Sequence, residues 1–393
     1  MASIASRFTP RLEQRKNDFL FRQRPLATSA QQAIMQINGL RCVNFSSNDY
    51  LGFANHPEIK NAVSNALNSD ENSYGAGAAH LVTGHHLHHH LAEDELADWL
   101  GLERALLFST GYMANLAVHQ AILQTGDVII ADKLNHASLI DGAKLSEASL
   151  KRYPHLDMDA LERRLQQTQA QETQALIVTD GVFSMDGDIA PLPQIQSLAQ
   201  KYGAWLLVDD AHGLGAIGTT GKGSFEHYGI QPDENTIIVG TLGKAFGVSG
   251  AFVAGSQILI ETLIQFARPY IYTTAMPQVN AVAIRAALKQ VKHAKASRET
   301  LKDNIAFFKQ GASEIGLTLW PSDSAIQPII LKQSEIALAW SETLKQLGFW
   351  VTAIRPPTVP KNQARLRVTL TAAHTKEDIQ GLLNALQQLH NDT

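Results

Sequence analysis

Short apolar runs alternate with amphipathic stretches along the middle of this chain, from about residue 90 to residue 280. The runs have the length of buried strands, and the stretches between them repeat at the spacing of a helix. They predict strands over 105–108, 127–131, 175–179, 204–209, 236–240 and 250–254, and helices over 93–102, 111–123, 159–171 and 191–202. Unbroken apolar strands that alternate with helices are typical of a mostly parallel sheet covered on both faces.

The pattern changes toward both ends of the chain. Residues 6–24 predict an amphipathic helix closed by Pro25, and a short strand over 42–46 follows. The last part predicts helices over 279–293, 298–315, 334–347 and 375–390, and strands over 326–331, 350–354 and 365–370. We therefore expect an N-terminal helix and arm in residues 1–55, a large α/β domain in 56–280 and a smaller α+β domain in 281–393.

The composition narrows the functional classes. Charged residues make up 18% of the chain, and the formal net charge is −4. An average soluble chain has roughly 25% charged residues, so this one resembles neither a charged disordered chain nor a nucleic-acid binder. No apolar run approaches the roughly 20 residues of a membrane span, and no signal sequence is evident. With Cys42 as the single cysteine, we expect a cytoplasmic protein. The low share of charged residues suggests a large subunit interface.

Two local patterns suggest other functions, and neither is convincing. Gly213, Gly215 and Gly218 match the spacing of a dinucleotide fingerprint, but further glycines follow where that fold needs a helix, so we expect a loop and no nicotinamide. A histidine cluster suggests a metal-binding protein; it comprises His80, His85, His86, His88, His89 and His90. No cysteine accompanies it and its spacing matches no standard zinc site, so we expect a solvated helix start and no metal.

The strongest constellation joins two strand ends. Asp209 ends an apolar strand, and Lys244 lies in a Gly-rich turn just after another strand. A lysine in such a turn is well placed for Schiff-base chemistry, and an acid at a strand end is well placed to pair with a pyridinium nitrogen. Together they suggest pyridoxal phosphate (PLP) as the cofactor.

Other residues fit the same cofactor. Gly111 and Tyr112 lie at a strand-to-helix junction, where free N–H groups and the helix dipole favour a phosphate. Thr241, three residues before Lys244, offers a hydroxyl to it. His136 follows the strand over 127–131, where its imidazole is expected to stack on the cofactor ring.

Six segments then carry a resemblance that covers nearly the whole chain: 46–52 (SSNDYLG), 109–112 (STGY), 135–138 (NHAS), 181–188 (GVFSMDGD), 209–213 (DDAHG) and 243–247 (GKAFG). With them the chain resembles the α-oxoamine synthases, a branch of the fold-type I PLP-dependent enzymes. That resemblance implies a homodimer with shared active sites.

The resemblance also implies roles for individual residues. Lys244, His136 and Asp209 are the expected catalytic residues, with Lys244 holding the cofactor, Asp209 pairing with its ring nitrogen and His136 stacking on the ring. The remaining cofactor contacts are expected from Gly111, Tyr112, Ser184, His212, Thr241 and, in the segment that reaches the neighbouring subunit, Thr274. Substrate contacts are expected from Asn48, His136, Arg355, Thr358 and an N-terminal arginine, Arg22, with Arg24 close by.

The segment 354–360 (IRPPTVP) looks like the family member of biotin biosynthesis. That likeness implies a decarboxylative condensation of L-alanine with a pimeloyl thioester, carried on coenzyme A or on acyl carrier protein. Glycine-using members, which are glycine C-acetyltransferase and 5-aminolevulinate synthase, are the alternatives. Asp180 stands where the family usually has Glu, and Ala78 and Ala79 replace a Gly-Ser pair, which puts the fine positioning of the cofactor in question.

Overall fold

The computed structural model describes residues 3–391, and these form two compact units. Among the described residues, the large unit comprises 48–184 and 188–300, and the small unit comprises 3–47, the short segment 185–187 and 301–391. The unit boundaries thus fall at 47/48 and 300/301, where the sequence suggested 55/56 and 280/281. The N-terminal residues group with the C-terminal ones because their strands pair with each other.

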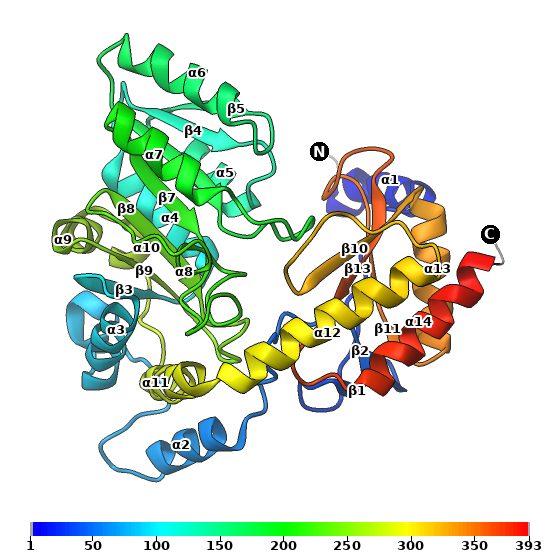
Figure 1. The fold of residues 1–393 in the computed structure, drawn as a ribbon. Helices are drawn as coiled ribbons and strands as arrows, with labels where there is room; N and C mark the ends of the chain where they lie inside the picture. Colours follow the sequence, from blue (N-terminus) through cyan, green and yellow to red (C-terminus); the bar gives the residue numbers. More distant parts are fainter. Residues whose placement is uncertain (1–2, 392–393) are drawn as a thin grey trace. The chain divides into compact units, whose positions relative to one another are not determined.

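A seven-stranded sheet forms the centre of the large unit (Figure 1). Its order is β3 (Arg104–Phe108), β9 (Ala251–Gly255), β8 (Thr236–Thr241), β7 (Trp205–Asp209), β6 (Ala175–Asp180), β4 (Val128–Asp132) and β5 (Ser149–Tyr153). The five strands from β8 to β5 are parallel, which confirms the predicted sheet, and only β9 runs antiparallel to both of its neighbours. A parallel return needs a crossover of a dozen or more residues, and the connection over residues 242–250 is shorter than that.

The large unit also contains helices, several of which bury apolar side chains on the sheet. The helices are α2 (Pro57–Leu67), α3 (Leu87–Leu100), α4 (Gly111–Ile122), α5 (Ala137–Leu145), α6 (Met158–Gln169), α7 (Leu192–Tyr202), α8 (Ser224–His227), α9 (Gln257–Phe266), α10 (Arg268–Ile271) and α11 (Gln278–His293). Side chains of α4, α5 and α9 share one apolar core with strands β3, β4, β6, β7, β8 and β9. This core holds the strand ends in place, which matters because the expected site residues follow those ends.

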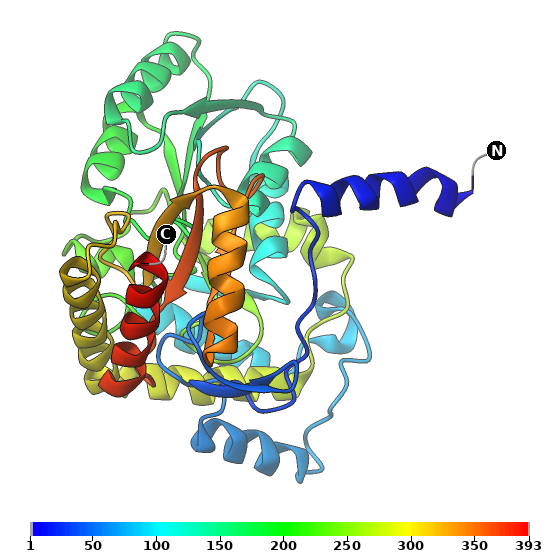
Figure 2. The same ribbon diagram turned by 90° about the vertical axis from the view of Figure 1, so that its right-hand side faces the viewer.

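The small unit contains two three-stranded sheets. One has the order β1 (Ile34–Ile37), β2 (Leu40–Asn44) and β11 (Phe349–Trp350), and the other has β10 (Ile326–Lys332), β13 (Ala364–Thr369) and β12 (Thr352–Ile354). Its helices are α1 (Ile4–Asn17), α13 (Ser334–Gln346), α14 (Lys376–Asn391) and most of α12 (Lys295–Glu314). Helix α13 lies against the second sheet (Figure 2).

Three predicted elements were wrong in extent. The expected strand over 350–354 is two short strands in different sheets, β11 parallel to β2 and β12 antiparallel to β13. The N-terminal helix ends at Asn17, well before Pro25, because Asp18 closes it and Phe19 takes a left-handed backbone conformation. Helix α3 begins at Leu87, six residues before the predicted start, inside the histidine cluster. No helix among residues 3–391 is long and apolar enough to cross a lipid bilayer.

Candidate active site

The carboxyl ends of neighbouring strands bring the acidic residues of the large unit together. In the register of the sheet Asp180, the last residue of β6, lies beside Asp209, the last residue of β7. Asp209 lies beside Val239 of β8, and that strand ends at Thr241, three residues before Lys244. Ligands of open α/β sheets bind outside such carboxyl ends, so the sheet places these groups at one edge where a ligand is expected.

Asp209 is buried, with 6% of its surface exposed, and both of its carboxylate oxygens are hydrogen-bonded. The side-chain amide of Asn115 donates to Oδ2 at 2.6 Å, and the backbone N–H of Ala211 donates to Oδ1 at 3.2 Å. These two donors hold the carboxylate in one orientation. A carboxylate held in this way is suited to pair with a pyridinium N–H.

A chain of side-chain hydrogen bonds runs from Asp209 to His136. The Asn115 amide also donates to Oγ of Ser138 at 2.8 Å, and that oxygen lies 2.7 Å from Nδ1 of His136. The backbone N–H of His136 donates to Oδ2 of Asp180 at 2.8 Å. These contacts fix the imidazole at the start of α5, where His136 is also the N-cap residue.

The charge of Lys244 acts on the same groups. Burial lowers the pKa of His136, the Asp209 carboxylate raises it, and the Lys244 ammonium lowers it. Burial raises the pKa of Asp180, the Asp209 carboxylate raises it further, and the Lys244 ammonium opposes them. The Lys244 amine changes the pKa of both His136 and Asp180, and the Asp209 carboxylate does the same. These four residues therefore form one cluster of titratable groups, as pyridoxal chemistry requires.

The first turn of α4 offers the features of an anion site. Thr110 caps this helix, and its Oγ1 accepts the N–H of Met113 at 3.2 Å, which leaves the N–H groups of Gly111 and Tyr112 at the open end. A Cβ at position 111 would lie 3.9 Å from Cβ of Thr241, so the start of α4 and the end of β8 are adjacent. This donor set fits a phosphate group.

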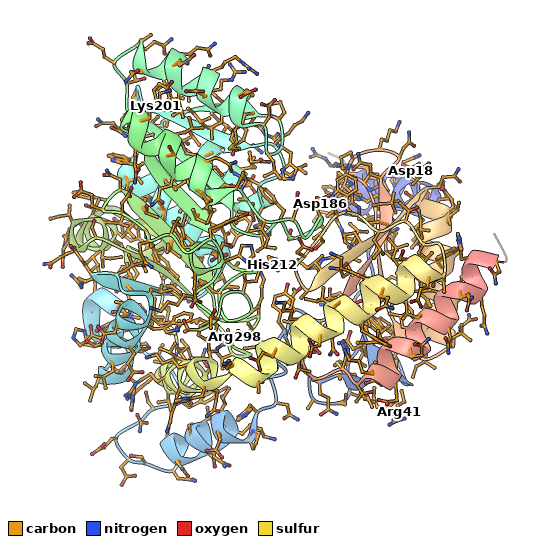
Figure 3. All side chains as sticks on the ribbon, in the orientation of Figure 1. Asp18, Arg41, Asp186, Lys201, His212 and Arg298 are labelled. Carbon is orange, nitrogen blue, oxygen red and sulfur yellow. The ribbon has the colours of Figure 1, made fainter. Side chains whose placement is uncertain are left out.

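Two further predicted residues lie near a tyrosine that the sequence analysis did not single out. Nδ1 of His212 is 2.5 Å from the hydroxyl of Tyr50, which also lies 3.5 Å from Oδ1 of Asn48. His212 follows β7 and is labelled in Figure 3. Tyr50 thus joins His212, an expected cofactor contact, to Asn48, an expected substrate contact.

Ser184 and Thr274 lie in two loops of the large unit. Ser184 lies in the connection between β6 and α7, which an isolated bridge between Val182 and Ile189 closes. Thr274 is exposed, and the next residue, Ala275, donates its backbone N–H to the carbonyl of Ala78 at 3.0 Å. The departure at Ala78 therefore adjoins the segment that carries Thr274.

In the small unit, Arg22 and Arg355 lie close enough for their charges to interact. Burial lowers the pKa of Arg355, and the positive charge of Arg22 lowers it further. Nη1 of Arg355 donates to the carbonyl of Phe19, and the carbonyl of Arg355 accepts the N–H of Thr358 at 3.1 Å. Two adjacent guanidinium groups are suited to bind carboxylates. The neighbour of Arg355 in this cluster is Arg22, not Arg24.

Asn115 was missed although it connects Asp209 to His136. The signal for it was present, because a polar residue lies at the centre of the otherwise apolar stretch 113–118 of α4. Asn115 is fully buried, and a buried amide requires hydrogen-bond partners. Tyr50 carried no comparable signal, because its partner His212 is distant in the sequence.

The expected solvated helix start was wrong for two of the histidines. His80 and His89 are buried: the ring of His80 stacks on Tyr270 with ring centroids 5.2 Å apart, and Nε2 of His89 lies 2.9 Å from the carbonyl of Met276. His80 begins a π-helical turn, η1 (His80–Gly84), which precedes α3.

The Gly-rich stretch after β7 is a loop, as predicted. Its glycines are needed for close packing, because a Cβ at Gly213 would lie 2.1 Å from Oδ1 of the buried Asp210. Gly215 and Gly218 have positive φ, and α8 begins only at Ser224. The loop therefore lacks the helix start that a dinucleotide site requires.

Curated proteins resemble the chain over nearly its full length. The family of class I and II aminotransferases matches residues 41–386. An 8-amino-7-oxononanoate synthase from Hydrogenovibrio crunogenus is 68% identical, over 99% of this chain and 98% of the relative. A protein of the same name from Stutzerimonas stutzeri is 51% identical, over 96% of this chain and 95% of the relative.

Solved structures resemble the fold as well. A serine palmitoyltransferase from S. paucimobilis with a bound PLP–myriocin aldimine has a TM-score of 0.93 at 29% identity, covering 100% of this chain and 99% of the other. An 8-amino-7-oxononanoate synthase from Francisella tularensis has a TM-score of 0.77 at 33% identity, covering 89% and 98%. The residues expected to bind pyridoxal phosphate thus belong to a chain that resembles a PLP-bound enzyme throughout.

Proposed function

Because the chain belongs to the class I and II aminotransferase family of PLP enzymes, we propose that it condenses L-alanine with a pimeloyl thioester. The products are 8-amino-7-oxononanoate, carbon dioxide and the free thiol carrier, and the reaction is a step of biotin biosynthesis. The observation that carries this conclusion is the 68% identity, over 99% of the chain, to a relative named for that product.

The residues of the large unit fit the cofactor. Asp209 provides a buried carboxylate for the ring nitrogen, and the N–H groups of Gly111 and Tyr112 with the hydroxyl of Thr241 provide donors for the phosphate. Lys244 provides the amine for the Schiff base. When bound, pyridoxal phosphate supplies an electron sink for the negative charge that develops at the alanine Cα.

The protein residues then divide the remaining tasks. Lys244, once its Nζ is free and neutral, removes the proton from the alanine Cα. Asp209 keeps a proton at the ring nitrogen, and the hydrogen-bond chain through Asn115 and Ser138 orients His136. Burial lowers the pKa of His136, which favours the neutral imidazole, and its ring offers a flat face to the cofactor ring.

Substrate recognition is assigned to carboxylate-binding groups and to the turn near Tyr50. We propose that Arg355 binds the alanine carboxylate, and that Arg22 and Thr358 contact the acyl substrate. Asn48 and His136 complete the substrate contacts, while Ser184 and His212 contact the cofactor. The support for the arginine assignment is that burial and the positive charge of Arg22 both lower the pKa of Arg355, an effect that a bound carboxylate would oppose.

A homodimer and a cytoplasmic location are further parts of this proposal. The large unit exposes apolar side chains around residues 74–87 and 272: Tyr74 is 76%, Leu81 50%, Val82 75%, Leu87 66% and Tyr272 73% exposed. Large exposed apolar side chains are typical of an interface, and Thr274, the cofactor contact expected in the segment that reaches the neighbouring subunit, lies two residues after Tyr272. The low charge share and the single buried Cys42 agree with this picture.

Product analysis tests the reaction. The purified protein with PLP is given L-alanine or glycine, together with pimeloyl-CoA or the pimeloyl acyl carrier protein, and the products are identified by mass spectrometry. We expect 8-amino-7-oxononanoate from L-alanine, with thiol and carbon dioxide released in equal amounts. Comparing the rates with the two thioesters shows whether coenzyme A or acyl carrier protein carries the acyl substrate. Turnover with glycine but not with L-alanine would contradict the proposal. Light scattering gives the molecular mass in solution. A protein that is monomeric by this measurement and still fully active would contradict the dimer.

A further inference from the structure

The histidine cluster contains two overlapping groups of metal-ligating side chains in the large unit. His80, His85 and His89 form one group, and His85, His90 and Glu93 form the other; in each group the ligand atoms lie within 4.8 Å of one another. His85 belongs to both groups. None of these residues takes part in the proposed reaction.

The first group is already engaged in hydrogen bonds. The backbone N–H of His86 donates to Nδ1 of His89 at 3.0 Å, and Nε2 of His89 lies 2.9 Å from the carbonyl of Met276. Both ring nitrogens of this buried histidine are therefore used within the protein. A metal ion at His89 would have to displace one of these bonds, at the cost of a buried unpaired group.

The second group keeps ligand atoms available. His85 and His90 are exposed, and His90 and Glu93 are three residues apart on α3, so they share one face of that helix. Glu93 is 6% exposed, and its Oε1 accepts the N–H of Leu107 at 2.9 Å, which orients the carboxylate. Oε2 belongs to the same carboxylate and has lone pairs of its own. Nδ1 of His85 lies 3.1 Å from Nδ1 of His80, so His85 retains Nε2 for a metal ion.

These contacts match the usual surroundings of a metal ligand. A ligating histidine is normally oriented by a hydrogen bond at its other ring nitrogen, and a ligating carboxylate is itself hydrogen-bonded. Two imidazoles and one glutamate are a ligand set that zinc uses in proteins, with water in the fourth position.

We propose that His85, His90 and Glu93 bind a divalent transition-metal ion of the Zn²⁺ type. His80 orients the ring of His85 through the contact between their Nδ1 atoms. The exposed carboxylate of Asp94, whose Oδ2 lies 3.6 Å from Nε2 of His90, adds negative charge beside the ion. Bound there, the ion fastens the turn before α3 to the helix itself. It stabilises this region of the large unit and has no part in the condensation.

Zinc titration of the untagged holoenzyme tests the proposal. The protein is freed of metal with a chelator, and Zn²⁺ binding is followed by calorimetry and by metal analysis after dialysis. We expect one ion per chain and an unfolding temperature raised by a few degrees. His85→Ala and Glu93→Gln should each lower the affinity at least about tenfold, and His80→Gln should lower it by a similar factor through the lost orientation.

His88→Ala is the matched control. His88 lies in the same run of histidines, but its Nδ1 is 3.0 Å from Nη1 of Arg285 and it belongs to neither group. This variant should bind zinc like the parent protein, and both it and His85→Ala should keep the parent rate of condensation. Because His85 and His88 do not lie in the core, circular dichroism is expected to show unchanged folds for both.

Three results would overturn the assignment. Equal loss of zinc in His88→Ala and His85→Ala would mean unspecific binding to the run of histidines. Zinc binding that survives His90→Ala but not His80→Gln would place the ion at the buried group instead. A rise in molecular mass on adding zinc, measured by sedimentation, would mean that the ion bridges two molecules.

Discussion

His155 joins two acidic side chains at the edge of the sheet, and its loss should destabilise the large unit. Nδ1 of His155 lies 2.9 Å from Oδ1 of Asp132, and Nε2 lies 2.7 Å from Oδ2 of Asp188. Asp132 precedes the turn that carries His136, and Asp188 closes the loop that carries Ser184. The imidazolium therefore fastens two segments of the proposed active site.

The size of the expected loss in stability follows from how deeply His155 and its two aspartate partners are buried. The side chain of Asp132 is fully buried, and those of His155 and Asp188 are each 19% exposed. Oδ1 of Asp188 is buried and has no hydrogen-bond partner among the described residues, so this carboxylate depends on His155. Removing one partner of a buried ion pair costs about 3–5 kcal/mol, and because of the residual exposure we expect about 3 kcal/mol for His155→Gln.

The interaction of His155 with Asp132 and Asp188 also makes the stability of the protein depend on pH. Burial alone would lower the pKa of His155, but the hydrogen bonds to Asp132 and Asp188 raise it from 6.5 to about 10. A group with a raised folded-state pKa contributes all of its stabilisation below its unfolded value and loses it as the pH rises through the folded value. The contribution of His155 should be complete below pH 6.5, decline above it and vanish above about pH 10.

Urea unfolding at a fixed concentration of PLP measures both effects. The parent protein, His155→Gln and the control His293→Gln, which replaces an exposed histidine, are compared at intervals from pH 6 to pH 10. We expect the gap between parent and His155→Gln to be widest at pH 6 and to close toward pH 10. A gap below about 1 kcal/mol at pH 6, the range of exposed ion pairs, or a gap independent of pH would refute the reasoning.

Three other predictions concern the active site. Lys244→Ala should keep the far-UV circular dichroism but lose the visible absorbance of the bound cofactor and lower kcat by at least about 100-fold; an unchanged absorbance band would contradict the assignment. Asn115→Ala should remove the amide donor to Oδ2 of Asp209 and lower kcat/KM by about 10–100-fold, with a smaller change for Asn115→Gln, as steady-state kinetics will show. Arg355→Lys should raise KM for L-alanine about tenfold, and Arg22→Ala should raise KM for the thioester, while cofactor affinity measured by fluorescence stays constant; equal effects on both substrates would argue against separate roles.

The sequence by itself determined the elements of the central region and the chemistry at their ends. The strands ending at Asp180 and Asp209 were predicted to within a residue, because both faces of the sheet are covered and the strands are unbroken apolar runs. Lys244 and Asp209 were selected as candidate site residues because strand ends are recognisable from local pattern alone. Local pattern also excluded the dinucleotide site, since no helical period follows Gly218.

Only the tertiary structure decided which distant segments come together. The pairing of β2 with β11 joins the two ends of the chain, and no local period encodes a partner some 300 residues away. The same reason applies to Tyr50 beside His212, to Asn115 between Asp209 and Ser138, and to His155 between two aspartates. Hydrophobic periodicity reports whether a residue faces the core, but hydrogen-bond partners are set by the packing of elements far apart in the chain.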